Sequence, residues 1–330
     1  MKIVKGGLLT TVQDLGRYGY QKIGVTTAGA MDTFSLRLAN ILVGNPEGAA
    51  ALEITLQGPV VEFTSDALVA VTGAELAPKI ADVELPQARA VAVRGGSVLT
   101  FGRSVSGCRA YLAVAGGIDV PVVMGSRSTD LRGAIGGYEG RALGAGDRVA
   151  VGPMPAPAKE AILEALSTNH PLPFALTRRY VDTADQRARP TTGPVKCVRG
   201  PHFDHVTDAG KRAFFGERFQ VSTQADRMGY RLVGPDLSPS HGRELLSSAV
   251  TTGAVQLPPG GEAIVLMAER QTTGGYPVIA QVITTDLPLV AQLRPGDTMT
   301  FAEVGIPEAQ AALRAQHRAL ADITKGINDR

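Results

Sequence analysis

The segment Glu269–Tyr276, ERQTTGGY, carries the residue types of a ligand-binding loop between two strand-like runs. Its glycines allow positive φ angles or a close approach of a ligand to the backbone, and its neutral polar side chains donate and accept hydrogen bonds. The candidate ligand-binding residues are Gln271, Thr272, Gly274 and Tyr276. The pattern predicts either the edge of a binding site or a plain hairpin loop, because Gly-Gly after a strand is also a common turn signal.

A second amide, Gln256, precedes Leu-Pro-Pro-Gly at the end of another strand-like run, 253–257. We expect Gln256 and Gln271 to lie at neighbouring strand ends. Two amide groups can hold a urea-like or lactam group through paired donor and acceptor hydrogen bonds. The two residues are therefore predicted to bind a small amide.

A group of carboxylates and an amide surrounds the start of a predicted helix, 33–43. Asp32 ends the string Gly-Ala-Met-Asp, and Asn40 and Glu53 follow it. The free N–H groups and the dipole at a helix N-terminus suit an anion, which makes these residues candidates for ligand binding. The simpler interpretation of Asp32 is that its side chain caps the helix.

Two arginine-containing segments could bind an anion or stabilise developing negative charge. Arg127 lies among hydroxyls in Ser-Arg-Ser-Thr, and a guanidinium can bind a carboxylate or phosphate bidentately. The alternative for Arg127 is a charge on a surface loop. Asp226 and Arg227 begin the string DRMGYR between two strand-like runs. There the alternative is a salt bridge that braces a turn, which is compatible with a ligand role.

The signatures of several enzyme classes are absent from the sequence. It contains no GxxxxGK[ST] phosphate loop, no GxSxG elbow, no HExxH and no strand-GxGxxG-helix unit. His202 and His205 have a spacing that could suit a metal, but no further His or Cys lies near them in the sequence. We therefore predict no metal site, and no Ser/His/Asp triad can be assembled.

The composition favours a folded, β-rich protein of short elements. The 330 residues are sufficient to bury a core, and 39 glycines and 21 prolines with no tryptophan indicate many tight turns. The formal net charge of +2 is spread thinly, which gives no electrostatic case for nucleic acid. Two isolated cysteines, Cys108 and Cys197, are expected to be buried in a reducing cytosol. With no signal-peptide pattern and no apolar run of ~18 residues, we expect a soluble cytoplasmic protein without a membrane segment.

Local patterns predict where the elements and domains lie. Strands are expected at 51–56, 59–64, 67–72, 91–93, 98–101, 109–115, 195–199, 218–223, 229–233, 245–250, 253–257, 263–268, 277–283 and 297–302, at a spacing typical of barrels and sandwiches. Besides the helix at 33–43, helices are expected near 159–166 and over 307–323, and 120–150 is predicted to be a functional loop. The predicted domains are a β-barrel-like unit, 1–153, a linker, 154–190, a second β-barrel-like unit, 191–303, and a terminal helical segment, 304–330.

The two halves of the chain resemble each other. GPVVEF and ALVAVT in 58–72 have counterparts in GAVQL and AIVLMA in 253–268, and LGAGDRV at 143–149 matches LRPGDTM at 293–299. Self-similarity at a period near half the chain implies a duplicated unit. Two such units would meet along a groove, which is a favoured place for a ligand.

The chain resembles the biotin-dependent carboxyltransferase-like family, which includes the C subunit of 5-oxoprolinase, the Kip antagonist protein and the allophanate hydrolase subunit 2 domain. The strings that carry the resemblance, in order over about residues 3–303, are TVQDLGRYGYQKIGV, GAMD, LANILVGN, LEITLQGP, YLAVAGGIDVPVVMGSRST, ADRMGYRLVGP, GAVQLPPGGEAIVLMAERQTTGGYPVIAQV and QLRPGD. Their fixed order makes the resemblance more specific than any single motif.

The resemblance implies a mainly β fold of two cyclophilin-like β-barrel units with a few short helices. It also implies the C subunit of an ATP-dependent 5-oxoprolinase, which hydrolyses 5-oxoproline to glutamate together with an A and a B subunit, the latter of the Kip inhibitor-like type. ATP is then hydrolysed by the complex, with a site that can belong to another subunit. The alternatives are a carboxyltransferase subunit of a biotin-dependent urea or allophanate-type pathway and a non-catalytic antagonist of a Kip inhibitor-like regulator. The sequence has no biotin-accepting lysine motif, so any biotin would come from elsewhere.

Both family activities act on a planar amide whose carbonyl oxygen gains charge, so donors and a guanidinium near that oxygen would stabilise the transition state. We therefore expect Arg127 and Arg227 to stabilise charge and Asp226 or Glu53 to transfer a proton. The expected amide-binding residues are Gln256 and Gln271, and Asp32, Asn40, Thr272, Gly274 and Tyr276 complete the expected substrate site.

Overall fold

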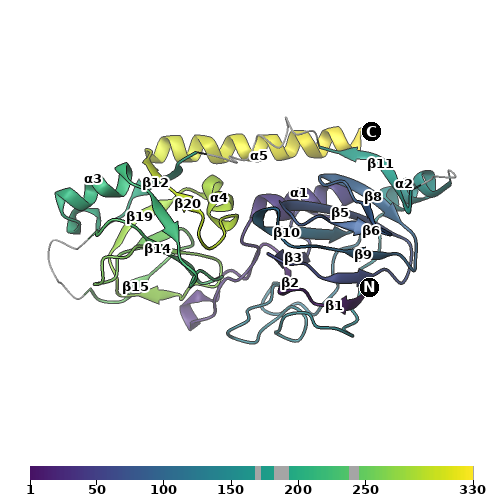
Figure 1. The fold of residues 1–330 in the computed structure, drawn as a ribbon, viewed down its shortest axis with the longest axis horizontal. Coiled ribbons are helices and arrows are strands. Elements are labelled where there is room, and N and C mark those ends of the chain that lie inside the picture. The colour runs from purple at the N-terminus through teal and green to yellow at the C-terminus, as the bar shows by residue number, and fades with distance from the viewer. Residues whose placement is uncertain (168–171, 182–192, 238–244, 330) are drawn as a thin grey trace. The chain divides into compact units, whose positions relative to one another are not determined.

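The computed structural model describes residues 1–167, 172–181, 193–237 and 245–329. These ranges form several sheets and the helices α1–α5, so the prediction of a mainly β fold with a few helices is confirmed (Figure 1). The chain divides into two compact units. Unit 1 comprises Met1–Arg17, Asp32–Gln186 and Ala319–Arg330, and unit 2 comprises Tyr18–Met31 and Arg187–Arg318.

Unit 1 contains two sheets. The larger has the order β11-β8-β5-β10-β3-β2, with all neighbours antiparallel. Its strands are β2 (Leu9–Gln13), β3 (Ala51–Thr55), β5 (Ala67–Glu75), β8 (Arg89–Val93), β10 (Ser106–Val114) and β11 (Phe174–Tyr180). The smaller sheet, in the order β1-β4-β9-β6-β7, consists of β1 (Lys2–Lys5), β4 (Val60–Glu62), β9 (Val98–Thr100), β6 (Lys79–Ile80) and β7 (Val83–Glu84).

Alternation along the strands places apolar and polar residues on opposite faces of the larger sheet. Leu52 and Ile54 of β3 belong to a hydrophobic core to which both sheets contribute. Glu53, between them, points to the other face, because successive side chains of a strand alternate. Tyr111 of β10 is paired in register with Glu53, so these two polar side chains are neighbours on that face.

Helix α1 (Thr33–Val43) packs beside this polar face. It begins at Asp32, whose carboxylate accepts a hydrogen bond from the Ser35 N–H at 2.9 Å, and it ends at Gly44, which has φ +78°. The Thr72 hydroxyl of β5 donates to the Ser35 carbonyl oxygen at 2.7 Å, which ties the first turn of the helix to the sheet. The predicted helix and its cap at Asp32 are both confirmed.

Unit 2 contains an eight-stranded sheet in the order β20-β13-β14-β17-β16-β19-β12-β21. Its strands are β12 (Val195–Arg199), β13 (Phe219–Val221), β14 (Gly229–Val233), β16 (Ala254–Gln256), β17 (Ile264–Leu266), β19 (Val278–Val282), β20 (Thr298–Met299) and β21 (Phe301–Glu303). Only Thr300 separates the two end strands β20 and β21, so the sheet curls back on itself into a near-barrel. Helices α3 (Asp208–Gly216) and α4 (Leu287–Ala291) belong to the same unit.

A small two-stranded sheet lies within unit 2 and includes part of the ERQTTGGY segment. It pairs β15 (Ser248–Ala249) with β18 (Thr273–Gly274). The Val250 N–H donates to the Thr272 carbonyl oxygen at 3.1 Å and extends the pairing by one bond. ERQTTGGY is thus a strand-forming segment and not a plain hairpin loop between β17 and β19.

Two segments differ from their sequence predictions. The helix predicted near 159–166 is confirmed as α2 (Ala156–Ser167), but the predicted linker, 154–190, also contains β11, which is hydrogen-bonded to β8 as the edge strand of the larger sheet. Helix α5 (Ile306–Asn328) runs beyond the predicted 307–323. Residues 120–150 have no helix or strand, as predicted, but Ser126, Ser128 and Thr129 are buried, so part of this segment is packed rather than freely exposed.

Both cysteines are buried, as expected. Burial, with smaller contributions from nearby carboxylates, raises the pKa of the Cys197 thiol to about 12, which removes it as a nucleophile at neutral pH. Across the part of the chain that the structure describes, no helix combines the length and the apolar character needed to cross a membrane.

Candidate functional site

The structure brings three of the predicted ligand-binding residues of unit 2 into contact. The Gln271 side-chain amide donates to the Gln256 carbonyl oxygen, with 3.1 Å between Nε2 and Oε1. Gln256 is 1 % exposed, and its Nε2 is a buried donor with no hydrogen-bond acceptor. A Cβ atom on Gly274 would lie 2.6 Å from this Nε2, so any other residue here would displace the Gln256 amide. The amide pair therefore leaves the NH2 group of Gln256 and the Oε1 of Gln271 without a hydrogen bond to the described residues.

The other two predicted residues of this segment make fewer side-chain contacts. Thr272 contributes its backbone carbonyl oxygen to the bond from Val250. Tyr276 is 46 % exposed at the end of the segment, where its phenol is open to solvent. Neither the backbone bond of Thr272 nor the exposure of Tyr276 assigns a chemical role to these side chains.

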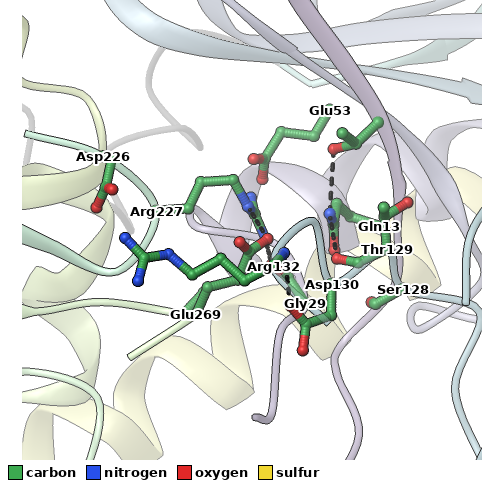
Figure 2. A network of polar contacts seen from close by, with 12 residues as sticks. Gln13, Gly29, Glu53, Ser128, Thr129, Asp130, Arg132, Asp226, Arg227 and Glu269 are labelled. Atoms are coloured by element: carbon green, nitrogen blue, oxygen red, sulfur yellow. Dashed lines mark hydrogen bonds and ion pairs between the residues drawn. The ribbon is translucent and has the colours of Figure 1, made fainter. Parts of the chain in front are cut away.

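Arg227 forms a buried ion pair in unit 2. Its Nε lies 2.6 Å from Oε1 of Glu269, and its Nη2 donates to the Gly29 carbonyl oxygen at 2.7 Å (Figure 2). Both charged side chains are almost fully buried. The positive charge of Arg227 is thus compensated by Glu269. The same guanidinium also binds the Gly29 carbonyl oxygen and so holds Gly29 near Glu269.

Asp226, the residue before Arg227, is exposed and braces the turn that leads into β14. Its Oδ1 accepts hydrogen bonds from the backbone N–H groups of Met228 at 2.8 Å and Gly229 at 3.2 Å. The turn is therefore held by backbone bonds to the Asp226 carboxylate, while Arg227 pairs with Glu269 from elsewhere in the sequence.

Arg270 is a second buried arginine in unit 2, and sequence analysis did not single it out. It is 6 % exposed. Its Nε donates to the Val250 carbonyl oxygen at 3.2 Å, and its Nη1 donates to the Thr27 hydroxyl at 2.9 Å. Burial lowers the pKa of Arg270, and the nearby Tyr18 phenol acts in the opposite direction. Both of its hydrogen-bond acceptors are neutral.

Two predicted residues of unit 1, Glu53 and Asp32, are linked through Tyr111. The Tyr111 hydroxyl donates to Oε2 of Glu53 at 2.7 Å and accepts from the Asp32 N–H at 2.8 Å. Nε of Arg109 lies 3.8 Å from the other oxygen of Glu53. Burial, and then the nearby carboxylates, raise the pKa of Tyr111 well above its usual value, so the phenol stays protonated. Glu53 is therefore a carboxylate with a fixed hydrogen-bond donor.

Asn40 has a structural environment. Its side-chain N–H groups donate to the carbonyl oxygens of Ala49 at 2.7 Å and Glu47 at 3.3 Å, and its Oδ1 accepts from the Asn45 amide at 3.0 Å. These bonds connect the end of α1 to the turn before β3. Because the amide is buried and bonded at both ends, Asn40 positions the chain here.

Arg127 lies in unit 1 on a segment organised by Asp14. The Asp14 carboxylate accepts from the Arg127 N–H and from the hydroxyls of Ser126 and Ser128, at 2.6 to 2.7 Å. The Arg127 guanidinium donates to the Val120 carbonyl oxygen at 3.0 Å and contacts the Asp119 carboxylate at 3.2 Å, and the side chain is 39 % exposed. It is a half-exposed charge on a well-ordered loop.

Two other features lie apart from the predicted site residues. His202 accepts a hydrogen bond at Nδ1 from the Val278 N–H at 3.0 Å, which gives this side chain a structural role. Within the described ranges, no three His, Cys, Asp or Glu side chains are grouped so that they could hold a metal. A groove of about 370 Å³ lies between α2, β11 and the end of α5, but it contains none of the predicted residues, and its Glu164 and Arg178 pair with each other at 3.8 Å.

Sequence analysis missed Tyr111, Asp14 and Arg270 for a common reason. Tyr111 lies in a strand that reads as a buried apolar run, and Arg270 lies in ERQTTGGY beside the more obvious Gln271. What these residues share is a partner far away in the sequence. The available signal was the charged pair Glu269 and Arg270, directly after the apolar run 263–268.

Comparison with known proteins identifies relatives over nearly the whole chain. A sequence model of the carboxyltransferase domain, subdomain A and B, matches residues 23–303. The chain is 40 % identical to the C subunit of 5-oxoprolinase from Escherichia coli (strain K12) over 320 residues, which is 96 % of either chain. It is 36 % identical to the C subunit of 5-oxoprolinase from Haemophilus influenzae, over 97 % of this chain and 96 % of that protein.

A solved structure is also similar. The crystal structure of the Kluyveromyces lactis urea carboxylase aligns with a TM-score of 0.86 at 30 % sequence identity. The alignment covers 99 % of this chain and 29 % of that chain, so the present protein corresponds to one part of a larger polypeptide in that case.

Proposed function

The chain belongs to the carboxyltransferase domain family, subdomain A and B, and we propose that it is the C subunit of an ATP-dependent 5-oxoprolinase. Its full-length similarity to the two bacterial proteins of that name supports the proposal, because the match leaves almost no part of either chain uncovered. The substrate is then the lactam 5-oxoproline, which the complex hydrolyses to glutamate.

The observation that carries the substrate assignment is the contact between Gln256 and Gln271. Their mutual hydrogen bond fixes both amides and leaves the NH2 group of Gln256 and the carbonyl oxygen of Gln271 unused. A buried donor without an acceptor costs about 1–3 kcal/mol, which a ligand carbonyl oxygen would recover. If the N and O positions of the Gln256 and Gln271 side-chain amides are exchanged, the pair still offers a ligand one donor group and one acceptor.

A cyclic amide matches this complement. Its ring holds the amide cis, so the N–H and the carbonyl oxygen point to the same side, whereas they point to opposite sides in the usual trans amide. We therefore propose that the lactam carbonyl oxygen accepts from Gln256 and that the lactam N–H donates to Gln271. Gly274 leaves the space that this arrangement needs beside Gln256.

The remaining predicted residues keep roles suited to their contacts. Arg127 is half-exposed and is proposed to stabilise negative charge, while Arg227 is proposed to contribute through the position of Gly29. Glu53, with its fixed donor Tyr111, and the exposed Asp226 are the two candidates for proton transfer. Thr272 and Tyr276 are proposed to border the substrate site of unit 2, whereas Asp32, which caps α1, and Asn40, which joins α1 to the turn before β3, are proposed to act within unit 1 without a bond to the substrate.

The proposed partners are homologues of the A and B subunits of 5-oxoprolinase, in the cytoplasm, with the B subunit of the Kip inhibitor-like type. The chain has no phosphate-loop signature, which supports an ATP site on another subunit. We further propose that the two units of the chain derive from a duplicated cyclophilin-like β-barrel and that the sequence-based domain limits, 1–153 and 191–303, approximate them. The repeated strings and the near-barrel of unit 2 support this origin.

A carboxyltransferase subunit in a biotin-dependent urea or allophanate-type pathway is the second candidate. The similarity to the K. lactis urea carboxylase favours it, because urea also presents an N–H and a carbonyl oxygen on one side. Biotin enters only in this alternative. An antagonist of a Kip inhibitor-like regulator would bind the B subunit without turning over either amide.

Reconstitution with homologues of the A and B subunits tests these proposals. The assembled complex should release ADP in the presence of 5-oxoproline and not in the presence of urea. Gln256→Leu and Gln271→Leu should each lower kcat/KM for 5-oxoproline about 100-fold, because each leaves a polar group of the substrate unpaired. The exposed Gln224→Leu is the matched control and should have no effect. An assembled complex without ADP release contradicts the function, and full activity of both variants contradicts the site.

A further inference from the structure

Arg270 stands out because its positive charge is buried and not compensated. Its five N–H groups include only two that donate hydrogen bonds to the described residues, one to the Val250 carbonyl oxygen and one to the Thr27 hydroxyl. No described residue contributes a carboxylate to it. Nη2, which makes neither bond, is not among the fully buried unpaired atoms, so the small exposed part of Arg270 includes Nη2.

The adjacent ion pair provides a comparison within the same unit. Arg227 is buried to a similar degree, but Glu269 lies 2.6 Å from its Nε and neutralises it. Glu269 precedes Arg270 directly in the sequence, and its Oε1 is bonded to Arg227. A buried charge normally has a partner of opposite sign, because removal from water is costly. Arg270 thus has the property expected of a residue whose negative partner arrives with a ligand.

The contacts of Arg270 tie its guanidinium to the small sheet whose strand β18 borders the amide pair of Gln256 and Gln271. Val250 accepts the bond from Arg270 and donates its own N–H to Thr272, so the guanidinium lies against the small sheet of β15 and β18. Gly274, in β18, borders the Gln256 amide. A planar guanidinium with free N–H groups binds a carboxylate or a phosphate strongly, and the amide pair binds a neutral amide.

We propose that Arg270 binds the carboxylate of the substrate and so selects lactams that carry an acid group next to the ring nitrogen. The inference rests on the proposed function, because 5-oxoproline is such a lactam, while 2-pyrrolidone has the same ring without the acid. The amide pair recognises the ring amide in both compounds. Arg270 binds the carboxylate that only 5-oxoproline carries, and so it discriminates between the two compounds.

The complex reconstituted with homologues of the A and B subunits tests this assignment. Arg270→Gln should raise KM for 5-oxoproline about 100-fold, leave KM for ATP unchanged, and remove the preference for 5-oxoproline over 2-pyrrolidone. Arg270→Lys keeps the charge without the planar fork and should show a smaller rise in KM. Arg231→Gln is the matched control, because Arg231 is more exposed and pairs with Glu262 at 3.5 Å. An unchanged KM for 5-oxoproline, or a rise in KM for ATP instead, overturns the proposal.

A binding measurement separates this proposal from the proposed function. The full chain alone should show a higher Tm in 5-oxoproline than in 2-pyrrolidone, and Arg270→Gln or Arg270→Lys should abolish or reduce that difference. If the complex releases no ADP but this difference is present and depends on Arg270, the proposed function fails and the carboxylate site stands. Equal Tm values of the wild-type chain in the two compounds overturn the carboxylate site, whatever the activity of the complex.

Discussion

The hydroxyl of Tyr111 is the best place to test how the polar face of unit 1 is held together. It donates to the buried carboxylate of Glu53 at 2.7 Å and accepts from the Asp32 N–H at 2.8 Å. Tyr111→Phe removes one oxygen atom and leaves both of these partners without that bond. The ring remains, so the packing against β3 and α1 is nearly unchanged.

The expected cost follows from the two lost bonds. A hydrogen bond to a charged group contributes about 1.5–3 kcal/mol, and a buried N–H left without an acceptor costs about 1–3 kcal/mol. Arg109, 3.8 Å from Glu53, still compensates the carboxylate in part, which favours the lower half of the sum. We expect Tyr111→Phe to reduce the free energy of unfolding by about 2–4 kcal/mol. Glu53→Gln combined with it should show a coupling of about 1 kcal/mol or more.

Native-state hydrogen exchange is the suitable assay, because the chain has two compact units and amide protection reports the stability of each unit separately. Protection of amides in β3 and β10 reports the stability of the sheet that carries Glu53 and Tyr111. Tyr138→Phe is the matched control, since the Tyr138 hydroxyl makes no hydrogen bond to the described residues and its ring lies 5.0 Å from the Arg141 guanidinium carbon. A loss below about 1 kcal/mol, equal to that of the control, would refute the reasoning.

Two further predictions concern unit 2. Arg227→Met should reduce the free energy of unfolding of unit 2 in urea by about 3–5 kcal/mol, because the buried charge of Glu269 loses its partner. Adding Glu269→Leu should recover most of this loss. A double variant no more stable than Arg227→Met contradicts the prediction. Burial, and then His205, lower the pKa of His202, so the folded chain binds fewer protons than the unfolded chain and stability should fall as pH drops below about 6.5. The Tm difference between pH 7.5 and pH 5.5 should be smaller for His202→Asn than for the wild type, whereas an equal difference would assign the pH dependence to other groups.

Local signals were sufficient for the elements whose causes are local. Asp32 and Gly44 mark the two ends of α1 in the sequence, and the helix begins and ends there. The strand β11 could not be predicted in the same way, because it exists through hydrogen bonds to β8, about 85 residues earlier. A segment rich in Pro and Ala has no local preference that reveals such a partner, and 154–190 was therefore predicted to be a linker.

The residues of the candidate site also differ in whether local sequence is sufficient to predict their contacts. Gln256 and Gln271 were predicted to lie at neighbouring strand ends, and the hydrogen bond between their side chains confirms that they are neighbours. The partners of Arg227 and Arg270, Gly29 and Thr27, lie about 200 or more residues earlier in the chain. No motif spacing connects positions so far apart. Only the folded chain distinguishes an arginine that is neutralised from one that is not.

The division of the chain into units has a consequence for how it folds during synthesis. Unit 2 contains the early segment Tyr18–Met31, and unit 1 is completed only by Ala319–Arg330, which is synthesised after the whole of unit 2. The early segment contains Thr27 and Gly29, whose partners Arg270 and Arg227 are synthesised much later. At usual rates of translation, these arginines follow the larger part of unit 1 by on the order of 10 s. Both units therefore depend on contacts of very high sequence separation, and unit 1 cannot finish folding before unit 2 has been synthesised. Slow folding and a need for chaperones during synthesis are the expected result.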